Sequence, residues 1–511
     1  MKKQAMSLAV TAALLGGAVS ATGQSMYINE GGLGETLIYP FYSAANGNDT
    51  YVHIVNTTDR TKAVKVRFIE AQNSDEVLDF NLYLSPEDEW AGVITRNPLL
   101  GSGNGAIIRT VDNSCTVPAF GVEAEATDTT PEVRSQAFVN LEYVDDIDDS
   151  VARTLEGYIE MIEMGQLDPS FGFGADAVHN AAGVPADCAA LVAAWTSPLN
   201  LAATPPTGQW IDDADTQLLT TWEGGGLYGY SVLINPDEGT AIGVDATAIA
   251  EFANAINGGL PTPSLHSNPG DILPGLASGT EFVTVFVDGE SDTLEMSSGL
   301  DAVSALFMTT GIINDYVIDP DINAMTDWVV TMPTKKSYTN GTAALAPFSS
   351  TWGPNEDETA DVACEPVSMD FWDREEAYEP PGTDGPVFSP KPDTPTSTDL
   401  EICTEVSVIT FGSSSAVQAT DSIRYGINDI LDYTEGWAIL DFTGDQLNTP
   451  LPSPARELAS EGEEVFIGLP ATGFAVFEYT NGSITDPVDG IVKANYEAAV
   501  DHKTIIKIAT P

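Results

Sequence analysis

Hydrophobic and polar residues alternate along residues 50–95 in a way that predicts several neighbouring β-strands. Within residues 63–69, apolar side chains alternate with the charged side chains of Lys65 and Arg67. A period of two is typical of a strand with one face buried and the other in water. We therefore expect Lys65 and Arg67 on a solvent-exposed strand face, as a small basic island. An acidic neighbour in an assembly, or more simply a local salt-bridge partner, would pair with them.

Short polar breaks separate these strands. The breaks fall at residues 56–59, 72–75 and 85–88, where short polar side chains favour turns. Strands that follow each other with no helix between them are typical of antiparallel sheets. Similar apolar runs recur in the second half, at 282–287 and 405–411 among others. The sequence predicts a mainly β fold, with immunoglobulin-like antiparallel β-sandwich domains and a few short covering helices.

Three segments have the composition and spacing of helices. Residues 186–195 are rich in alanine, and residues 246–256 place apolar side chains on one stripe. We expect both helices to cover an end of a sandwich. Residues 299–313 form the third predicted helix.

The N-terminus has the features of a secretory signal. Lys2 and Lys3 give a positive start, residues 5–19 are apolar, and small residues precede Thr22. The apolar run is too short for a comfortable membrane anchor, which is the alternative interpretation. We expect residues 1–21 to be removed, no integral membrane segment afterwards, and an exported protein. The compartment is extracellular or the cell surface, with the periplasm as the alternative.

The remaining chain is long enough for more than one domain. We predict an N-terminal β-sandwich domain over residues 22–258, with a helical or loop insertion at about 165–225. A segment rich in glycine and proline follows. A C-terminal β-rich domain then spans residues 277–511 and contains a proline-rich loop at 379–398.

Charge excludes some partners. The chain has 19 Lys and Arg against 76 Asp and Glu, a net charge of −57. Binding to nucleic acid or to an anionic membrane surface requires basic side chains, so neither is expected. Because 43% of the residues are hydrophobic and the acids are spread along the chain, we expect a folded protein with an acidic surface.

Four cysteines suit an exported protein with two disulfides. Three pairings are possible, and we favour those that stay within one half of the chain, Cys115 with Cys188 and Cys364 with Cys403. A metal or redox site is the alternative. It is disfavoured because no CxxC spacing occurs and histidine is scarce.

No common catalytic motif is present: GxSxG, SxxK and HExxH are all absent. A Ser-His-Asp triad assembled by folding, or a carboxylate pair acting on glycans, stays open as an alternative. Five tryptophans could stack on sugars or fill the core: Trp195, Trp210, Trp222, Trp352 and Trp372. The four histidines, His53, His179, His266 and His502, are far apart in sequence, and a structural role is expected for His53.

Calcium is the cofactor that the acidic loops would suit, because this cation prefers several oxygen ligands from flexible loops. No loop matches the full EF-hand pattern, so no cofactor at all is the alternative. The candidate ligands fall in four clusters: Asp145, Asp146, Asp148 and Asp149; Asp212, Asp213 and Asp215; Asp319, Asp321 and Asn323; and Asn355, Glu356, Asp357 and Glu358.

A resemblance adds to this picture. The segments that carry it are residues 56–58, 326–335, 436–438 and 468–474, which read NTT, TDWVVTMPTK, GWA and GLPATGF. With these segments the mature chain resembles a group of secreted, β-rich cell-surface proteins of proteobacteria. The resemblance implies an exported surface protein and no particular activity or functional residue.

The sequence therefore predicts a secreted or cell-surface structural or adhesive protein without enzymatic activity. It would form part of a surface layer, filament or extracellular matrix, with itself or other surface components as partners. A secreted hydrolase acting on polysaccharide and a soluble ligand-binding protein of the periplasm are the alternatives.

Overall fold

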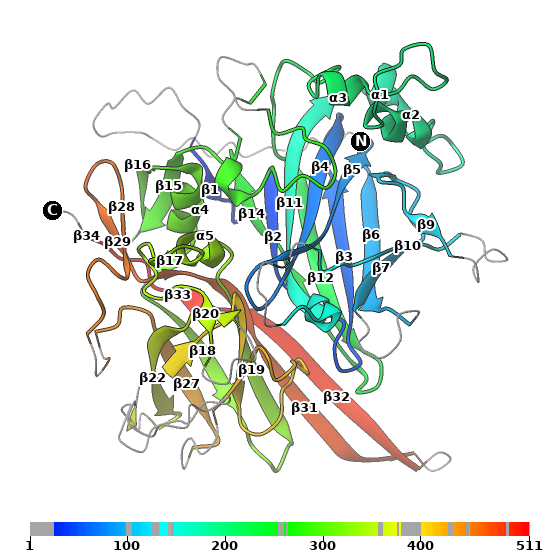
Figure 1. Ribbon diagram of the computed structural model, residues 1–511. Helices are drawn as coiled ribbons and strands as arrows, with labels where there is room; N and C mark the ends of the chain where they lie inside the picture. Colours follow the sequence, from blue (N-terminus) through cyan, green and yellow to red (C-terminus); the bar gives the residue numbers. More distant parts are fainter. Residues whose placement is uncertain are drawn as a thin grey trace, which may run out of the picture.

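The chain forms several sheets, in which nearly all neighbouring strands are antiparallel (Figure 1). The structure, a computed structural model, describes residues 25–509 apart from 99–104, 124–131, 142, 144–147, 254–259, 262–263, 288, 356–360, 376–377, 380–399, 428–432, 446, 448–449 and 487–489. Strands make up 46% of the residues and helices 9%, which confirms the mainly β prediction. The predicted signal at 1–21 and the proline-rich loop beyond residue 379 lie outside the described residues.

Two seven-stranded sheets build the N-terminal half. We call the first the middle sheet; its order is β1 (Tyr27–Ile28), β14 (Thr247–Ala250), β2 (Thr36–Ser43), β11 (Glu156–Leu167), β4 (Thr61–Glu70), β5 (Glu76–Leu84) and β8 (Cys115–Val117). We call the second the outer sheet; its order is β13 (Thr240–Asp245), β12 (Leu227–Asn235), β3 (Asp49–Asn56), β6 (Glu89–Arg96), β7 (Ala106–Thr110), β10 (Arg134–Ala137) and β9 (Gly121–Val122).

The two sheets face each other across an apolar core. Side chains that alternate along the strands meet there, including Val64 and Phe68 from β4, Ile54 from β3 and Trp90 from β6. Aromatic rings interlock within it, with Phe80 and Trp90 centred 5.7 Å apart. Packing of two antiparallel sheets face to face defines a β-sandwich.

Two further sheets build the C-terminal half. We call one the hairpin sheet; its order is β26 (Arg424–Ile427), β25 (Val406–Phe411), β19 (Ala324–Thr331), β31 (Thr472–Asp486) and β32 (Gly490–Asp501). We call the other the distal sheet; its order is β23 (Tyr378–Glu379), β22 (Glu365–Asp373), β27 (Glu435–Asp441), β18 (Gly311–Val317) and β33 (Lys503–Thr504), with β24 (Leu400–Ile402) also paired to β22. Trp328, Phe411 and Leu440 lie in the core between them.

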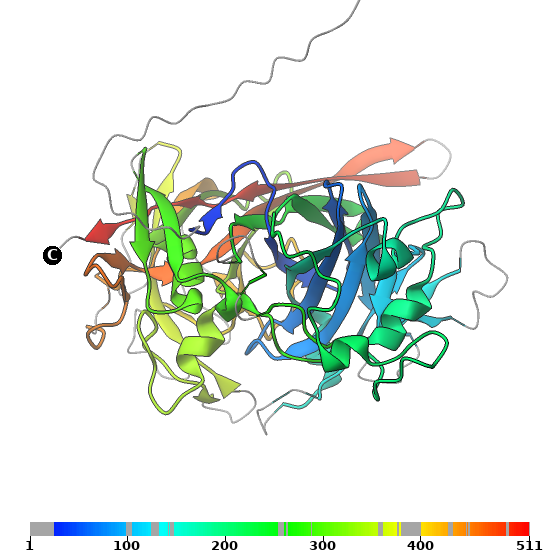
Figure 2. The same cartoon turned by 90° about the horizontal axis from the view of Figure 1, so that it is seen from above.

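The two sandwiches pack against each other through the middle sheet (Figure 2). Ile69 and Tyr158 of the middle sheet share an apolar cluster with Val329, Val406 and Val408 of the hairpin sheet. The middle sheet therefore has a hydrophobic contact on each face. The antiparallel sandwich prediction agrees with these contacts; the immunoglobulin-like connectivity and the predicted domain bounds stay predictions.

Smaller elements complete the fold. The short sheets pair β15 (Phe282–Val287) with β16 (Glu290–Glu295), β17 (Met308–Thr309) with β30 (Leu469–Pro470), β20 (Gly353–Pro354) with β21 (Asp361–Val362), and β29 (Val465–Ile467) with both β28 (Glu457–Ala459) and β34 (Ile508–Ala509). The helices are α1 (Gly172–Asp176), α2 (Cys188–Ala194), α3 (Gln209–Asp212), α4 (Gly299–Phe307) and α5 (Lys335–Thr339), with 3-10 turns at Val151–Leu155 and Leu276–Ser278.

Of the three predicted helices, one is confirmed, one is wrong and one is shorter than predicted. The helix expected at 186–195 is confirmed as α2, and α1 to α3 all lie in the insertion expected at about 165–225. The helix expected at 246–256 is wrong, because its first residues form β14, which pairs with β2 and β1. Sheet pairing here overrides a helical pattern of apolar residues. The third helix, expected to reach residue 313, ends at Phe307, where a run rich in Thr and Ile begins β17 and β18.

The expectation that Lys65 and Arg67 face water is also wrong. The side chain of Lys65 has no exposed surface, and Arg67 is 13% exposed. Lys65 Nζ lies 2.6 Å from Asp79 Oδ2, and the Arg67 guanidinium lies 2.6 Å from both Glu76 and Glu160. A local salt bridge, the simpler of the two explanations for these cations, is what the structure contains.

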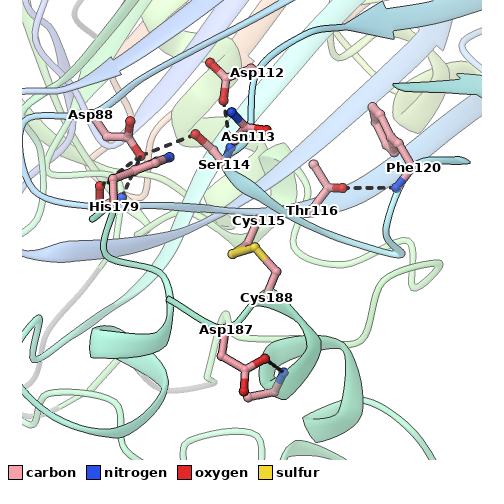
Figure 3. The surroundings of a disulfide bond; sticks show 12 residues. Asp88, Asp112, Asn113, Ser114, Cys115, Thr116, Phe120, His179, Asp187 and Cys188 are labelled. Atoms are coloured by element: carbon pink, nitrogen blue, oxygen red, sulfur yellow. Dashed lines mark hydrogen bonds and ion pairs between the residues drawn. A yellow bond between two sulfur atoms is a disulfide. The ribbon is translucent and has the colours of Figure 1, made fainter. Parts of the chain in front are cut away.

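Both predicted disulfides are confirmed. Cys115 of β8 pairs with Cys188 at the start of α2, and Cys364 pairs with Cys403 (Figure 3 shows the first). The first bond ties the insertion that carries α1 to α3 to an edge strand of the middle sheet. The second joins the two ends of the segment that contains the proline-rich loop.

Candidate functional site

The outward side of the outer sheet carries an unusual set of side chains for so acidic a protein. Burial alternates along β3, β6 and β12, so every second side chain points away from the core. The twelve outward positions are Asp49, Tyr51, His53, Val55, Glu89, Ala91, Val93, Thr95, Tyr228, Tyr230, Val232 and Ile234. Two of the twelve are acidic. We call the surface that these side chains form the aromatic face.

Strand register brings the aromatic side chains together. His53 of β3 lies opposite Tyr230 of β12 and Ala91 of β6. The ring of His53 is centred 4.0 Å from that of Tyr230 and 5.8 Å from that of Tyr228. Tyr51 adds a third phenol, with its ring centred 6.4 Å from that of Tyr230. Figure 1 shows β12, β3 and β6 as neighbours in this sheet.

The three tyrosines form the accessible part of this cluster and the histidine its floor. Tyr228 is 38% exposed, while His53 is only 3% exposed. Within the described residues, Nδ1 of His53 has no hydrogen-bond partner, and its Nε2 lies 3.5 Å from Glu89 Oε1. An unsatisfied buried polar atom costs about 1–3 kcal/mol, so this site gains from a ligand atom or water that reaches it.

Burial favours the neutral form of the Tyr51 phenol. Partial burial raises the pKa of Tyr51 above its ordinary value of 10.0, and the nearby carboxylate of Glu89 adds to the effect. A neutral phenol both donates and accepts a hydrogen bond. The aromatic face therefore offers flat apolar rings whose edges carry hydroxyl groups, a combination that favours ligands with both apolar and hydroxylated surfaces.

Sequence reasoning missed this surface. It placed His53 in the first strand but did not consider the tyrosines as a group. A signal was present, because Tyr228 and Tyr230 are spaced by two, as are Tyr51 and His53. The local sequence pattern does not predict that β3 pairs with β12, because more than 150 residues of chain separate these strands.

Among the described residues, one serine, one histidine and one aspartate meet, but not in the arrangement of a catalytic triad. Near the Cys115–Cys188 disulfide, His179 meets Ser85 and Asp88 (Figure 3). Nδ1 of His179 lies 2.9 Å from Ser85 Oγ and 3.5 Å from Asp88 Oδ2. In a triad the acid and the nucleophile contact opposite ring nitrogens, whereas here both contact the same one. Burial raises the pKa of Asp88, and Ser85 and Ser114 hydrogen-bond to its carboxylate.

The other two histidines are structural. His266 is 2% exposed; its Nδ1 lies 2.6 Å from the carbonyl oxygen of Ala214, and its Nε2 lies 3.0 Å from the hydroxyl of Tyr83. Burial lowers the pKa of His266 to about 4, which keeps the ring neutral. His502 is half-buried; desolvation lowers its pKa to about 4, and its Nε2 contacts the carbonyl of Val329.

Most of the tryptophans that could have stacked on sugars belong to the core. Trp195, Trp210 and Trp222 are between 1% and 8% exposed, and Trp210 packs on Phe173. Trp372 is partly exposed but stacks face to face on Trp437, with ring centres 4.1 Å apart. Trp352 lies beneath the Lys335 ammonium, which is 5.4 Å from its ring centre.

The calcium candidates are placed as follows. Asp145, Asp146 and residues 356–358 lie outside the described residues. Asp148, Asp213 and Asp319 each accept a backbone N–H two residues on, a turn contact that uses one carboxylate oxygen. Asn323 donates to the carbonyl of Thr480. In the part of the chain that is described, three His, Cys, Asp or Glu ligand atoms converge at Cys364, Glu401 and Cys403, where both sulfurs form a disulfide. Calcium binding stays a prediction.

Comparison with models of known protein families, with curated proteins and with solved structures finds no match to this chain. Among the described residues, no helix is both long and apolar enough to cross a membrane.

Proposed function

We propose that this protein is an exported, non-enzymatic adhesive component of the cell surface that binds a neutral polysaccharide through its aromatic face. The observation that carries the proposal is the cluster of Tyr51, Tyr228 and Tyr230 over His53 on an open sheet face. The signal-like N-terminus and the resemblance to secreted surface proteins support export.

The chemistry of the face favours a sugar. The C–H groups of a pyranose ring pack on aromatic faces, and its hydroxyl groups hydrogen-bond to phenols and carboxylates. Val55, Val93 and Val232 surround the rings and enlarge the apolar area. A sugar hydroxyl that reached the unpartnered Nδ1 of His53 could donate a hydrogen bond to it.

The charge of the chain selects among polysaccharides. The protein has a net charge of −57, so it repels glycans that carry carboxylate or sulfate groups. This repulsion opposes their binding. The acids Asp49 and Glu89 stand at the ends of their strands on the face itself. Neutral and amino-substituted chains avoid this repulsion, and neutral chains also bind independently of salt.

The test is depletion of the mature protein from solution by insoluble polysaccharides. We expect binding to at least one neutral polymer, such as cellulose or chitin, and no binding to a polyuronate. The double variant Tyr228→Ala/Tyr230→Ala should bind at least about tenfold more weakly, a loss of about 1.4 kcal/mol.

The matched control is Tyr496→Ala, because Tyr496 is a 60% exposed tyrosine on β32, in the other sandwich. This variant should bind as the unmodified protein does. Failure to bind any neutral polymer, or unchanged binding by the double variant, contradicts the proposal. Release of reducing sugars from the bound polymer would favour the hydrolase alternative instead.

A further inference from the structure

A second constellation lies inside the N-terminal sandwich, where a lysine and a glutamate meet with no access to water. Lys62 of β4 and Glu163 of β11 stand on neighbouring antiparallel strands of the middle sheet. Nζ of Lys62 lies 2.6 Å from Oε1 of Glu163, and neither side chain has any exposed surface. Since a C–O bond is about 1.2 Å long, the carboxyl carbon is within about 4 Å of the amine.

Hydrogen-bond donors hold the glutamate in place. The backbone N–H of Gly225 donates to Oε2 of Glu163 at 3.0 Å, and Nε2 of Gln166 donates to Oε1 at 2.9 Å. A fixed N–H aimed at a carboxyl oxygen stabilises the negative charge that develops there when a nucleophile attacks the carbon. Preorganised donors of this kind lower the barrier to acyl transfer.

A second acid, Glu35, lies near the pair, and its backbone carbonyl accepts the N–H of Glu163 at 2.8 Å. Glu35 is 2% exposed; its Oε2 accepts the N–H of Ala253 at 2.7 Å, and its Oε1 lies 3.4 Å from the Trp222 indole nitrogen. Burial, together with the charge of Glu163, raises the pKa of Glu35 to about 8. At neutral pH Glu35 therefore keeps its proton, as a general acid must.

The loop that follows Trp222 closes over this acid. A Cβ atom on Gly224 would lie 1.8 Å from Oε1 of Glu35, so this position requires glycine. Glu35 is 2% exposed and the side chains of Lys62 and Glu163 have no exposed surface, so bulk solvent does not reach these groups. The site is dry, which favours a reaction that releases water.

We propose that Lys62 and Glu163 condense to an isopeptide bond that joins β4 to β11. A proton first passes from the Lys62 ammonium to the Glu163 carboxylate, 2.6 Å away. The lone pair that this frees on Nζ then attacks the carboxyl carbon of Glu163, and one C–O bond breaks as the new C–N bond forms. The departing oxygen leaves as water with two protons from the ammonium nitrogen. An ammonium and a carboxylate become one neutral amide and one water, so atoms and charge balance without a further reactant.

Burial supplies the driving force. A fully buried ion pair carries a desolvation cost that its mutual attraction barely offsets. Condensation removes both charges from the interior and leaves an amide that the same donors can satisfy. Lys65 and Asp79 provide the comparison: they are also 2.6 Å apart, but Asp79 is partly exposed and the adjacent Glu76 is bonded to Arg67. We expect that pair to stay ionic.

The test is the intact mass of the mature protein after reduction of both disulfides. We expect a mass lower than that of the sequence by one water molecule, and a branched peptide that joins residues 62 and 163 after digestion. Lys62→Arg should restore the full mass, because a guanidinium keeps the positive charge but is not a nucleophile at neutral pH. Glu35→Gln should slow bond formation at least about tenfold.

The control is Lys65→Arg, which should keep the mass deficit. The proposal would be overturned if the unmodified protein had the full mass of its sequence and gave separate, unbranched peptides containing residues 62 and 163. This measurement uses the unmodified protein, so it does not depend on the folding of any variant. A deficit that maps to Lys65 and Asp79 would overturn it as well. Bond formation at an unchanged rate in Glu35→Gln would overturn the part assigned to Glu35.

Discussion

The two faces of the N-terminal sandwich that point away from its core show how similar sequence patterns can have opposite fates. On the middle sheet, β4 turns the charged Lys65 and Arg67 away from the core, yet both are buried in ion pairs. On the outer sheet, β3 and β12 turn Tyr51, Tyr228 and Tyr230 away from the core, and these remain open to solvent.

Covering elements make the difference. Over Lys65 and Arg67 lies the segment 264–275: Lys65 Nζ donates to the carbonyl of Asn268, and Gly275 approaches the Arg67 guanidinium. The hairpin sheet covers the neighbouring part of the same face around Ile69. On the aromatic face, by contrast, Tyr228 is 38% exposed and Tyr51 and Tyr230 are partly exposed. A period of two thus identifies a strand, but what lies over each face depends on distant segments.

The largest expected effect is loss of the buried guanidinium on the middle sheet. Arg67→Ala leaves Glu76 and Glu160 without their cation in the interior, and breaking a buried pair in this way costs about 3–5 kcal/mol. Urea unfolding, followed by tryptophan fluorescence, measures the change in the free energy of unfolding.

Arg374→Ala is the matched control. Arg374 is 65% exposed and pairs with Glu435 at 2.8 Å, so its loss should cost less than about 1 kcal/mol. If Arg67→Ala and Arg374→Ala lowered the free energy of unfolding by equal, small amounts, the charged side of β4 would be accessible to water. That result would contradict the burial of Arg67 in its ion pairs.

Loss of the Cys115–Cys188 disulfide should have the next largest effect. The bond ties α2 to β8 at the edge of the middle sheet (Figure 3). Replacing both cysteines by serine should cost about 2–5 kcal/mol. Limited proteolysis should then cut first within the insertion around α1 to α3. Cleavage that begins instead in the C-terminal half would contradict the anchoring role.

A smaller effect is expected from pH, and it arises from buried acids. Burial raises the pKa of Glu156, which accepts hydrogen bonds from Thr420 of the other sandwich, to about 7, and that of Glu35 to about 8. In the unfolded chain, both carboxyl groups lose their protons near pH 4.5. Between pH 4.5 and the raised pKa values, the folded state therefore binds more protons than the unfolded state. The free energy of unfolding therefore falls as pH rises from about 5 to about 8.

Thermal unfolding measured from about pH 5 to about pH 8 tests whether stability falls as the pH rises. Glu405 and Glu497 add to the slope, because burial raises their pKa values to about 8 and about 7. Glu156→Gln should flatten it. Neutral His266 and His502 act in the opposite direction below about pH 6.5, so the highest Tm should fall at mildly acidic pH. A Tm that rises steadily toward pH 8 would contradict the assignment of these buried acids.

The sequence predictions that proved correct were based on local patterns. Alternation in residues 63–69 predicted β4, and the cysteine positions allowed the two correct pairings to be chosen. Nonlocal contacts explain the failures. The segment at 246–256 has helical spacing, yet pairing with β2 draws it into a sheet. The aromatic face is equally nonlocal, since His53 and Tyr230 meet only after β3 and β12 pair.

Chemical footprinting of tyrosine, with and without a bound neutral polysaccharide, tests the central claim most directly. Tyr228 and Tyr230 should react in the free protein and become protected in the complex, while Tyr496 stays equally reactive in both states. Mass spectrometry of the labelled peptides gives the extent of reaction at each position. Unchanged reactivity of Tyr228 and Tyr230 in the complex would show that the polysaccharide binds elsewhere, and the aromatic face would lose its assigned function.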